Sequence, residues 1–143
     1  MTVKELARAA GVPASRVRYY ARSGLLPAAR DPDNDYRCFG PQDLARLRFI
    51  VAARALGFAL RDVGRLLDAA DTGQSPCPSV RRLLERRLAA VAAQRRALAR
   101  EHARLMALRA RWQVEPDGHP DSRRLCPLLD RVPAELLHAA GDG

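Results

Sequence analysis

The chain has 143 residues and a formal net charge of +9, from 25 Lys and Arg against 16 Asp and Glu. This length predicts one compact domain, or a small domain with an extension. The charge points to a polyanionic partner, nucleic acid first and an anionic membrane surface second, although a basic surface that is merely solvated is a third alternative. Aromatic residues make up 5% of the chain, which argues against a surface that stacks single-stranded bases or RNA.

The cysteines are odd in number, at Cys38, Cys77 and Cys126. No apolar signal segment precedes them, and no apolar run approaches the length of a membrane span. We therefore expect a cytoplasmic protein without a membrane partner, whose thiols are mostly reduced. In that setting cysteines serve as buried apolar residues, metal ligands or redox sensors, and not as disulfides.

The first two dozen residues have the pattern of a helix-turn-helix. Thr2 is a capping residue and Glu5 follows three positions later, which predicts a capping box at the start of a short helix. Gly11 ends that helix, and Pro13 suits the first turn of a second one, from about Ala14 to Arg22. Polar side chains of the second helix are left to face a DNA groove and its phosphates: Ser15, Arg16, Arg18 and Tyr19. A structural helical hairpin with a solvated basic face is the alternative.

Residues 25–39 predict a β-hairpin, because turn-forming residues separate two short extended runs. A hairpin in this place would be the wing of a winged helix-turn-helix. Its Arg30, Tyr36 and Arg37 would touch the sugar-phosphate backbone, which positions a protein without specifying sequence. A third helix over about residues 42–56 and a fourth over 59–70 would complete a DNA-binding domain at residues 1–70.

A linker at residues 71–78 precedes a stretch at 79–114 that contains neither glycine nor proline. Apolar residues recur in it at intervals of seven: Leu84, Val91, Leu98, Leu105 and Trp112. Such a repeat predicts a coiled coil, although Arg95, His102 and Arg109 interrupt the companion position. Little else in a short chain could cover this stripe, so we expect a homodimer. The alternative is a helix that packs back on its own domain.

Together these segments resemble the DNA-binding domain of the MerR family of transcription regulators. The resemblance covers residues 1 to about 70 and depends on a series of matching positions in order: Val12, Val17-Arg18-Tyr19-Tyr20, Gly24-Leu25-Leu26-Pro27, Tyr36-Arg37, Asp43, Leu47, Phe49-Ile50, Leu56-Gly57-Phe58 and Leu60. It implies a mainly α fold, with a winged helix-turn-helix, an antiparallel coiled-coil dimer and a short effector loop and helix at 115–143. It also implies binding to a pseudo-palindromic promoter and activation by DNA distortion, with RNA polymerase involved only indirectly.

The resemblance implies DNA contacts, mostly to phosphates, by Arg18, Tyr19, Tyr36 and Arg37, with a further contact by Arg54. We add Arg16 as a candidate for reading base edges, because arginine can bond a guanine bidentately. The sequence departs from the family where glutamate is usual, at Ala21, and where the wing turn usually has glycine, at Asp35. Aspartate tolerates the left-handed region better than most residues, so the hairpin should persist.

The segment Cys126-Pro127-Leu128-Leu129 is similar to the end of the effector loop in metal-sensing members of the family. Cys77 fits the place of a cysteine that sensors of divalent ions supply from the other subunit. The usual further cysteine at the start of the loop is missing, and Asp117 and His119 lie there instead. The implied site combines Cys77 of one subunit with His119 and Cys126 of the other, and Asp117 is a possible fourth ligand. These donors suit zinc, another thiophilic divalent ion, or copper(I) on two sulfurs.

Other interpretations are open for the cysteines and for the whole chain. Cys126 could pack and cap the last helix while Cys77 is incidental, in which case the effector is not a metal or does not exist. Cys38 is interpreted as a packing residue. The chain has no nucleophile–base pair, phosphate-binding loop or paired acids, so we do not expect an enzyme. A basic coiled-coil adaptor would explain residues 79–114 but not the helix-turn-helix.

Overall fold

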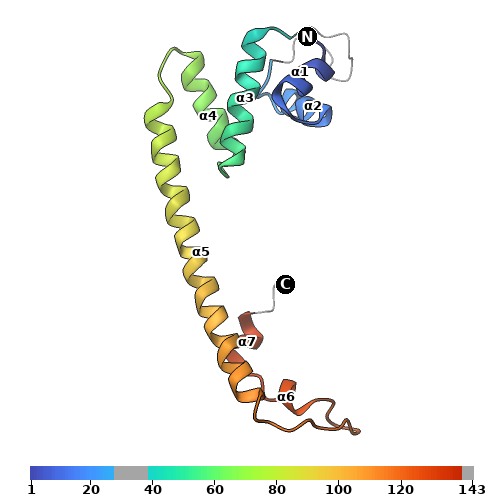
Figure 1. Cartoon of the computed structure of the whole chain (residues 1–143). Coiled ribbons are helices and arrows are strands. Elements are labelled where there is room, and N and C mark those ends of the chain that lie inside the picture. The colour runs from blue at the N-terminus through green and yellow to red at the C-terminus, as the bar shows by residue number, and fades with distance from the viewer. Residues whose placement is uncertain (28–38, 140–143) are drawn as a thin grey trace. The chain divides into compact units, whose positions relative to one another are not determined.

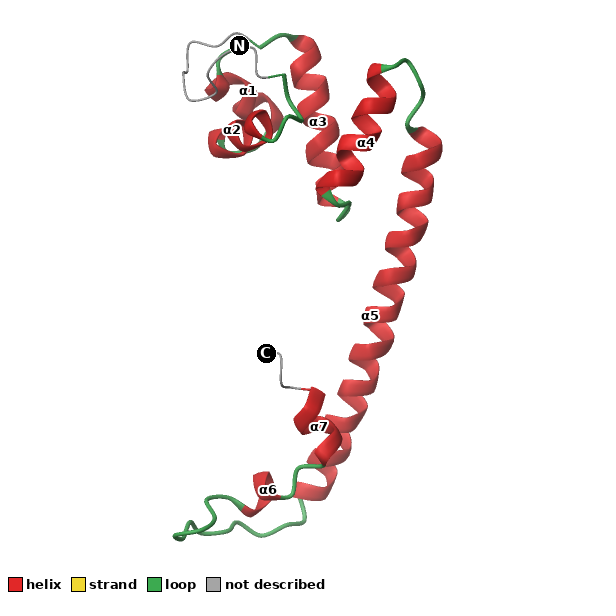
Figure 2. Cartoon of the chain, turned by 180° about the vertical axis from the view of Figure 1, so that it is seen from behind, coloured by secondary structure: helices red, strands yellow, loops and turns green. Residues whose placement is uncertain are grey.

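The computed structural model describes residues 1–27 and 39–139, and Figure 1 labels its helices in chain order. Their bounds are α1 Val3–Ala10, α2 Ala14–Arg22, α3 Pro41–Ala55, α4 Leu60–Asp71, α5 Cys77–Trp112, α6 Pro127–Asp130 and α7 Ala134–Ala139. Within the described residues there is no strand (Figure 2), so the mainly α class is confirmed. The predicted hairpin, with Tyr36 and Arg37, falls largely outside the described residues.

The helix-turn-helix is present, and its first helix begins for the reason that the sequence predicts. The Thr2 hydroxyl accepts the Glu5 backbone N–H at 3.2 Å, and the Glu5 carboxylate accepts the Thr2 N–H at 2.8 Å. This reciprocal capping box satisfies two backbone donors that would otherwise lack partners. Gly11 ends α1 in the left-handed region, with φ +73°. The second helix, α2, has the predicted bounds of Ala14–Arg22.

Helices α3 and α4 each begin and end within one residue of the predicted positions. Pro41 opens α3, where a missing N–H costs nothing, and the Asp43 carboxylate accepts the Gly40 N–H at 2.8 Å. Gly57 separates α3 from α4 with φ +88°. Capping residues, prolines and glycines therefore determine where these short helices begin and end.

One hydrophobic core joins these helices. Its fully buried side chains come from α1, α2, the segment after α2, α3 and α4: Val3, Leu6, Val17, Leu26, Leu47, Ile50 and Val63. Burial of a side chain of this size contributes about 1.5–3 kcal/mol. The inner face of α2 therefore packs against this core. The opposite face of α2 is exposed to solvent in a fixed orientation.

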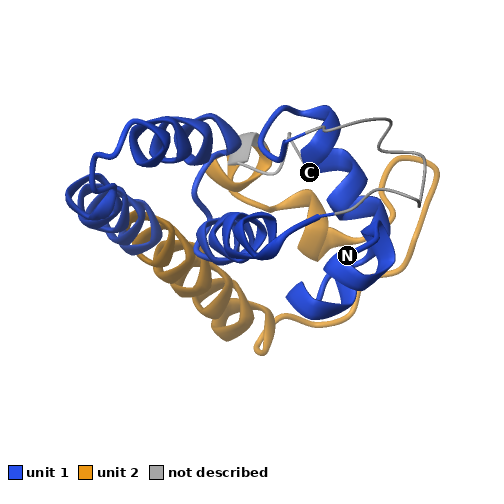
Figure 3. Ribbon diagram, turned by 90° about the horizontal axis from the view of Figure 1, so that it is seen from above, with its two compact units in different colours: residues 1–92 blue, residues 93–143 orange. Residues whose placement is uncertain are grey.

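The chain divides into two compact units, Met1–Ala92 and Ala93–Gly143, and the division falls within α5 (Figure 3). The first turns of α5 belong to the first unit, because Leu83 is buried in its core and Val80 packs against it. A Cβ atom placed on Gly57 would lie 2.6 Å from Nε of Arg87, so this part of α5 also covers the turn between α3 and α4. For these turns, the alternative in which the helix packs on its own domain is correct.

The second unit contains the remainder of α5, a loop, α6 and α7. In it Leu108 is buried, whereas Leu98 and Leu105 are 63% and 53% exposed. The Glu115 carboxylate and the Arg131 guanidinium form an ion pair of 3.4 Å that closes the base of the loop. Throughout the described part of the chain, no helix combines the length and apolarity that a bilayer crossing requires.

Candidate DNA interface and effector site

A groove of about 400 Å³ lies on the first unit between α2 and the end of α3. Its lining comes from both helices: Arg16, Tyr19, Tyr20, Val51, Arg54 and Ala55. Three of these residues, Arg16, Tyr19 and Arg54, are predicted DNA contacts from separate parts of the sequence. No carboxylate is among these lining residues, so the groove has the chemistry of a site for an anionic ligand.

The geometry of α2 explains why Arg16 and Tyr19 face outward. Val17 and Tyr20 are almost completely buried, as the helical period predicts, and they hold one face of α2 against the core. Arg16 is exposed, and Tyr19 is 50% exposed with its ring centroid 5.5 Å from that of Tyr20. The tyrosine pair thus offers an apolar body with an outward hydroxyl beside a mobile cation.

Arg54 is held at the groove by the end of its own helix. Its Nη1 donates to the Phe58 carbonyl at 2.6 Å, which satisfies a backbone acceptor just beyond α3. A guanidinium has five N–H donors, so this bond leaves others for a phosphate. The same contact gives Arg54 a structural role, which the sequence analysis did not foresee.

The other predicted DNA contacts are distributed differently. Arg18 is half-buried on α2 and is not among the residues lining the groove. Tyr36 and Arg37 lie outside the described residues. The groove therefore unites three of the six predicted contacts.

The sequence analysis missed Arg46, which is 21% exposed in the middle of α3. Its guanidinium bonds to the Leu25 carbonyl and to the Asp71 carboxylate. The sequence does contain a pattern that indicates a partly buried Arg46. Arg46, Ile50 and Ala53 have the i, i+4, i+7 spacing of one helix face, and Ile50 and Ala53 are buried. A charge at the edge of a buried face needs a partner.

The predicted metal ligands have different surroundings. Cys77 is exposed and is the first residue of α5, where its N–H donates to the Ser75 hydroxyl at 3.3 Å. Cys126 is half-buried at the N-cap position of α6, but its side chain makes no capping hydrogen bond. Cys126 thus occupies the capping position of this helix without using its thiol for it. His119 is exposed in the loop.

The loop folds back on itself close to Cys126. A Cβ atom placed on Gly118 would lie 2.3 Å from Cγ of Pro127, so only glycine fits at this approach. The Asp121 carboxylate accepts the backbone N–H groups of Arg123 and Arg124 at 2.7 and 2.8 Å. These hydrogen bonds lower the pKa of Asp121 below its ordinary value. The start of the loop, with His119, is thus drawn toward the residue that follows Cys126.

A single chain does not assemble a complete metal site. In the part of the chain that the structure describes, no three or more His, Cys, Asp or Glu side chains cluster closely enough to hold an ion. Two thiols and an imidazole are the donors that zinc and softer ions prefer. By donor type, Cys77, His119 and Cys126 suit such an ion.

Comparisons with known proteins agree with this geometry. Residues 1–70 match the family model described as MerR HTH family regulatory protein, and residues 44–108 match the one described as MerR, DNA binding. The mercuric resistance operon regulatory protein of Pseudomonas fluorescens is 35% identical over 108 residues, 76% of this chain and 74% of the relative. The chain spans about half the length of two other curated mercuric resistance regulators that it matches, 46% of one and 57% of the other.

Two solved structures are also similar. The transcription regulator PbrR691 from Ralstonia metallidurans CH34, in complex with lead(II), has a TM-score of 0.68 and 30% identity over 91% of this chain and 97% of its own. HiNmlR, a MerR family regulator that lacks the sensor domain and is bound to promoter DNA, has a TM-score of 0.50 and 27% identity over 79% of this chain and 86% of its own.

The helix-turn-helix and its basic groove define a DNA-binding protein of the helix-turn-helix class. The order of helices, the two family models and the relatives together specify the group. The chain belongs to the MerR family of DNA-binding transcription regulators.

Proposed function

We propose that the chain is a homodimeric regulator that binds a pseudo-palindromic promoter through the groove between α2 and α3 and responds to a thiophilic metal ion. The observation that most strongly supports this proposal is the convergence of Arg16, Tyr19 and Arg54 on one groove without a carboxylate. Arg16 would read a base edge, while Arg18, Tyr19, Arg54 and the wing residues Tyr36 and Arg37 would bind phosphates.

The dimer is supported by the apolar row on α5. Five side chains of this row are at least one-third exposed in the single chain: Leu84, Leu88, Val91, Leu98 and Leu105. Soluble monomers rarely expose a continuous apolar strip of this kind. An apolar groove of about 400 Å³ follows at the end of the helix, lined in part by Leu105, Leu108 and Trp112. A second α5 packed in antiparallel orientation would cover both features.

A salt titration tests the phosphate contacts. Binding to duplex DNA should weaken linearly in log–log coordinates as salt rises, because each neutralised phosphate releases a counterion. Arg18→Ala and Arg37→Ala should each weaken binding about equally on all sequences and reduce the salt slope by about 1. Either variant that changed sequence preference without changing the slope would contradict this assignment. A wild-type protein that ignored duplex DNA at low salt would refute the whole proposal.

For the metal, we propose that Cys77 of one subunit joins His119 and Cys126 of the other. Support comes from the similarity to a mercuric resistance operon regulatory protein and to a transcription regulator in complex with lead(II). A second supporting observation is that the thiol of Cys126 makes no capping hydrogen bond to α6. Such a site would bias the dimer between two states with different spacing of the DNA-binding units.

Metal binding can be tested with a matched control. Cys126→Ser should abolish tight zinc binding, measured by equilibrium dialysis of the purified dimer, while duplex affinity stays nearly unchanged. Cys38→Ser removes a cysteine that is outside the proposed site and should bind zinc as the wild type does. Equal zinc affinity in the two variants would exclude the site. A wild-type dimer that bound no thiophilic ion would favour the second candidate, a regulator with a non-metal effector or none.

We further propose that the regulator activates transcription by distorting promoter DNA, so that RNA polymerase is affected only indirectly. Transcription in vitro from the cognate promoter should then rise on metal addition with no change in the amount of bound regulator. A response that followed promoter occupancy alone would argue against distortion.

A further inference from the structure

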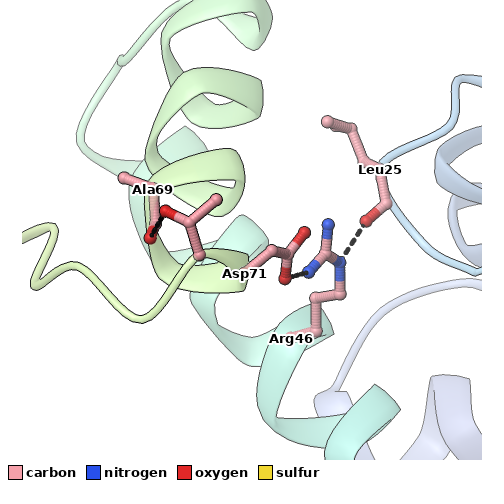
Figure 4. Close-up of polar contacts among 5 residues, drawn as sticks. Leu25, Arg46, Ala69 and Asp71 are labelled. Atoms are coloured by element: carbon pink, nitrogen blue, oxygen red, sulfur yellow. Dashed lines mark hydrogen bonds and ion pairs between the residues drawn. The ribbon is translucent and has the colours of Figure 1, made fainter.

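Arg46 joins two segments of the first unit that are far apart in the sequence. Its Nε donates to the Leu25 carbonyl at 2.6 Å, and its Nη1 donates to the Asp71 carboxylate at 2.8 Å (Figure 4). The partners are 21 and 25 residues away. A planar guanidinium can serve two acceptors in fixed directions at once, which an ammonium group cannot do.

The two acceptors differ in their surroundings: one is the backbone carbonyl of a buried residue, and the other is a carboxylate whose side chain is 55% exposed. Leu25 is 9% exposed, and a buried backbone carbonyl requires a hydrogen-bond donor. Asp71 is the last residue of α4, whose final turn contains no basic residue. A carboxylate at the negative end of a helix dipole is unfavourable unless a cation lies beside it. Arg46 therefore stabilises both positions with one side chain.

The two partners lead to different functional segments. The N–H groups of Leu25 and Leu26 donate to the Tyr20 carbonyl at 3.0 and 3.2 Å, so Leu25 is attached to the end of α2. Asp71 begins the linker that ends at Cys77. In that linker the Thr72 hydroxyl donates to the Ala69 carbonyl at 2.9 Å, and the Gln74 N–H bonds to the same carbonyl at 2.9 Å.

We infer that Arg46 is a positioning residue that couples the DNA-facing helix α2 to the linker between α4 and α5. The inference rests on the proposed DNA binding but requires no metal. Coupling free energies are reciprocal, so DNA bound at α2 should stabilise the linker to the same extent that an ordered linker stabilises DNA binding. Arg46 would act through Leu25 and Asp71, without touching DNA itself.

Amide hydrogen exchange of the full chain tests this inference, with and without a short mixed-sequence duplex at low salt. In the wild type, the duplex should slow exchange at the Thr72, Gly73 and Gln74 amides by about two- to fivefold, the range for a partly exposed ion pair. Asp71→Asn should abolish this effect, since it removes the ion pair. Arg46→Lys should weaken it as well, because lysine retains the charge but its flexible ammonium lacks the fixed planar donors of the guanidinium.

Asp68→Asn is the matched control, because it removes the same charge from α4 at an exposed position. It should retain the effect of the duplex on the linker amides. If Asp71→Asn also retained it, or if the wild type showed none while bound, the coupling would be refuted.

Exchange in the free protein separates this result from a failure of the proposed function. Without DNA, Arg46→Lys should speed exchange at the Leu25 and Leu26 amides, and Asp68→Asn should not. A wild type that bound no duplex would refute the proposed DNA binding alone. Unchanged exchange at these two amides in Arg46→Lys would overturn the role of Arg46 whatever the DNA result.

Discussion

Helices α1 to α4 bury most of their large apolar side chains, whereas α5 exposes many of its own. Leu47 and Ile50 of α3 are completely buried, but Leu98 and Leu105 of α5 are more than half exposed. Both sets have regular helical spacing and similar hydrophobicity. The difference shows that apolar periodicity identifies a face to be buried without identifying what buries it. For α1 to α4 the cover comes from the same chain, and for the exposed row of α5 we propose that it comes from a second copy.

The largest expected effect of a single substitution falls on the core of the first unit. Ile50→Ala leaves a cavity in the core of the first unit, because its side chain has no exposed surface. The free energy of unfolding should fall by about 2–5 kcal/mol, which urea denaturation followed by circular dichroism would measure. A loss well under 1 kcal/mol would mean that this core is looser than its burial indicates.

The corresponding change in the second unit should affect association instead. Leu98→Ala should weaken the dimer by about 1.5–3 kcal/mol, the value of burying a leucine side chain. It should leave the unfolding of the first unit almost unchanged. Sedimentation equilibrium would measure the dimer constant, and the emission of Trp112, the one tryptophan of the chain, would report on the end of the row during dilution. An unaltered dimer constant would show that this row does not form the interface.

The two units should also differ in how their exposed arginines contribute to DNA binding. Arg16→Ala removes a guanidinium from the groove and should weaken binding to the cognate promoter by about 1–3 kcal/mol, with relaxed preference at one base pair. Arg100→Ala removes the same charge from an exposed position on α5 in the second unit. It should change affinity by less than about twofold at moderate salt. Equal losses in the two variants would favour a general charge effect over a defined groove.

The smallest expected effect concerns the loop of the second unit. Asp121→Asn weakens two charge-assisted hydrogen bonds, so exchange should accelerate at the Arg123 and Arg124 amides, with no change in the first unit. The pKa of Asp121 is lowered in the folded chain. Its stabilising effect is therefore present above the unfolded-state pKa and is lost as the pH falls through the folded-state value. Protection of these amides relative to their intrinsic exchange rate should fall as acid protonates Asp121, and protection that did not change would contradict this account.

Much of the first unit could be predicted because its signals are local. Thr2, Glu5, Gly11 and Pro41 act on their nearest neighbours, and the bounds of α1 to α4 follow from them to within one residue. Three of the predicted DNA contacts converge on one groove, since the helical period placed Arg16 and Tyr19 opposite Val17. The wing residues fall outside the described residues, so their roles stay predictions.

Other features depend on contacts between distant residues, which leave no local pattern. Val80 and Leu83 lie within the stretch predicted as a coiled coil, but both pack on the core of their own unit. The partners of Arg46 are equally remote in sequence. The C-terminal segment was predicted as a loop and a single short helix. It forms α6 and α7 instead, with Pro133 between them, and Leu137 is largely exposed.

The burial of Leu83 has a consequence for anyone who wishes to cut or recombine this protein. A fragment that ended in the linker between α4 and α5 would lack Leu83, which is buried in the core, and Arg87, which lies against the turn at Gly57. The smallest piece with a complete interior therefore extends to about Ala92, where the first unit ends. Chimeras that exchange sensor segments between relatives should be joined beyond this point, inside the continuous helix.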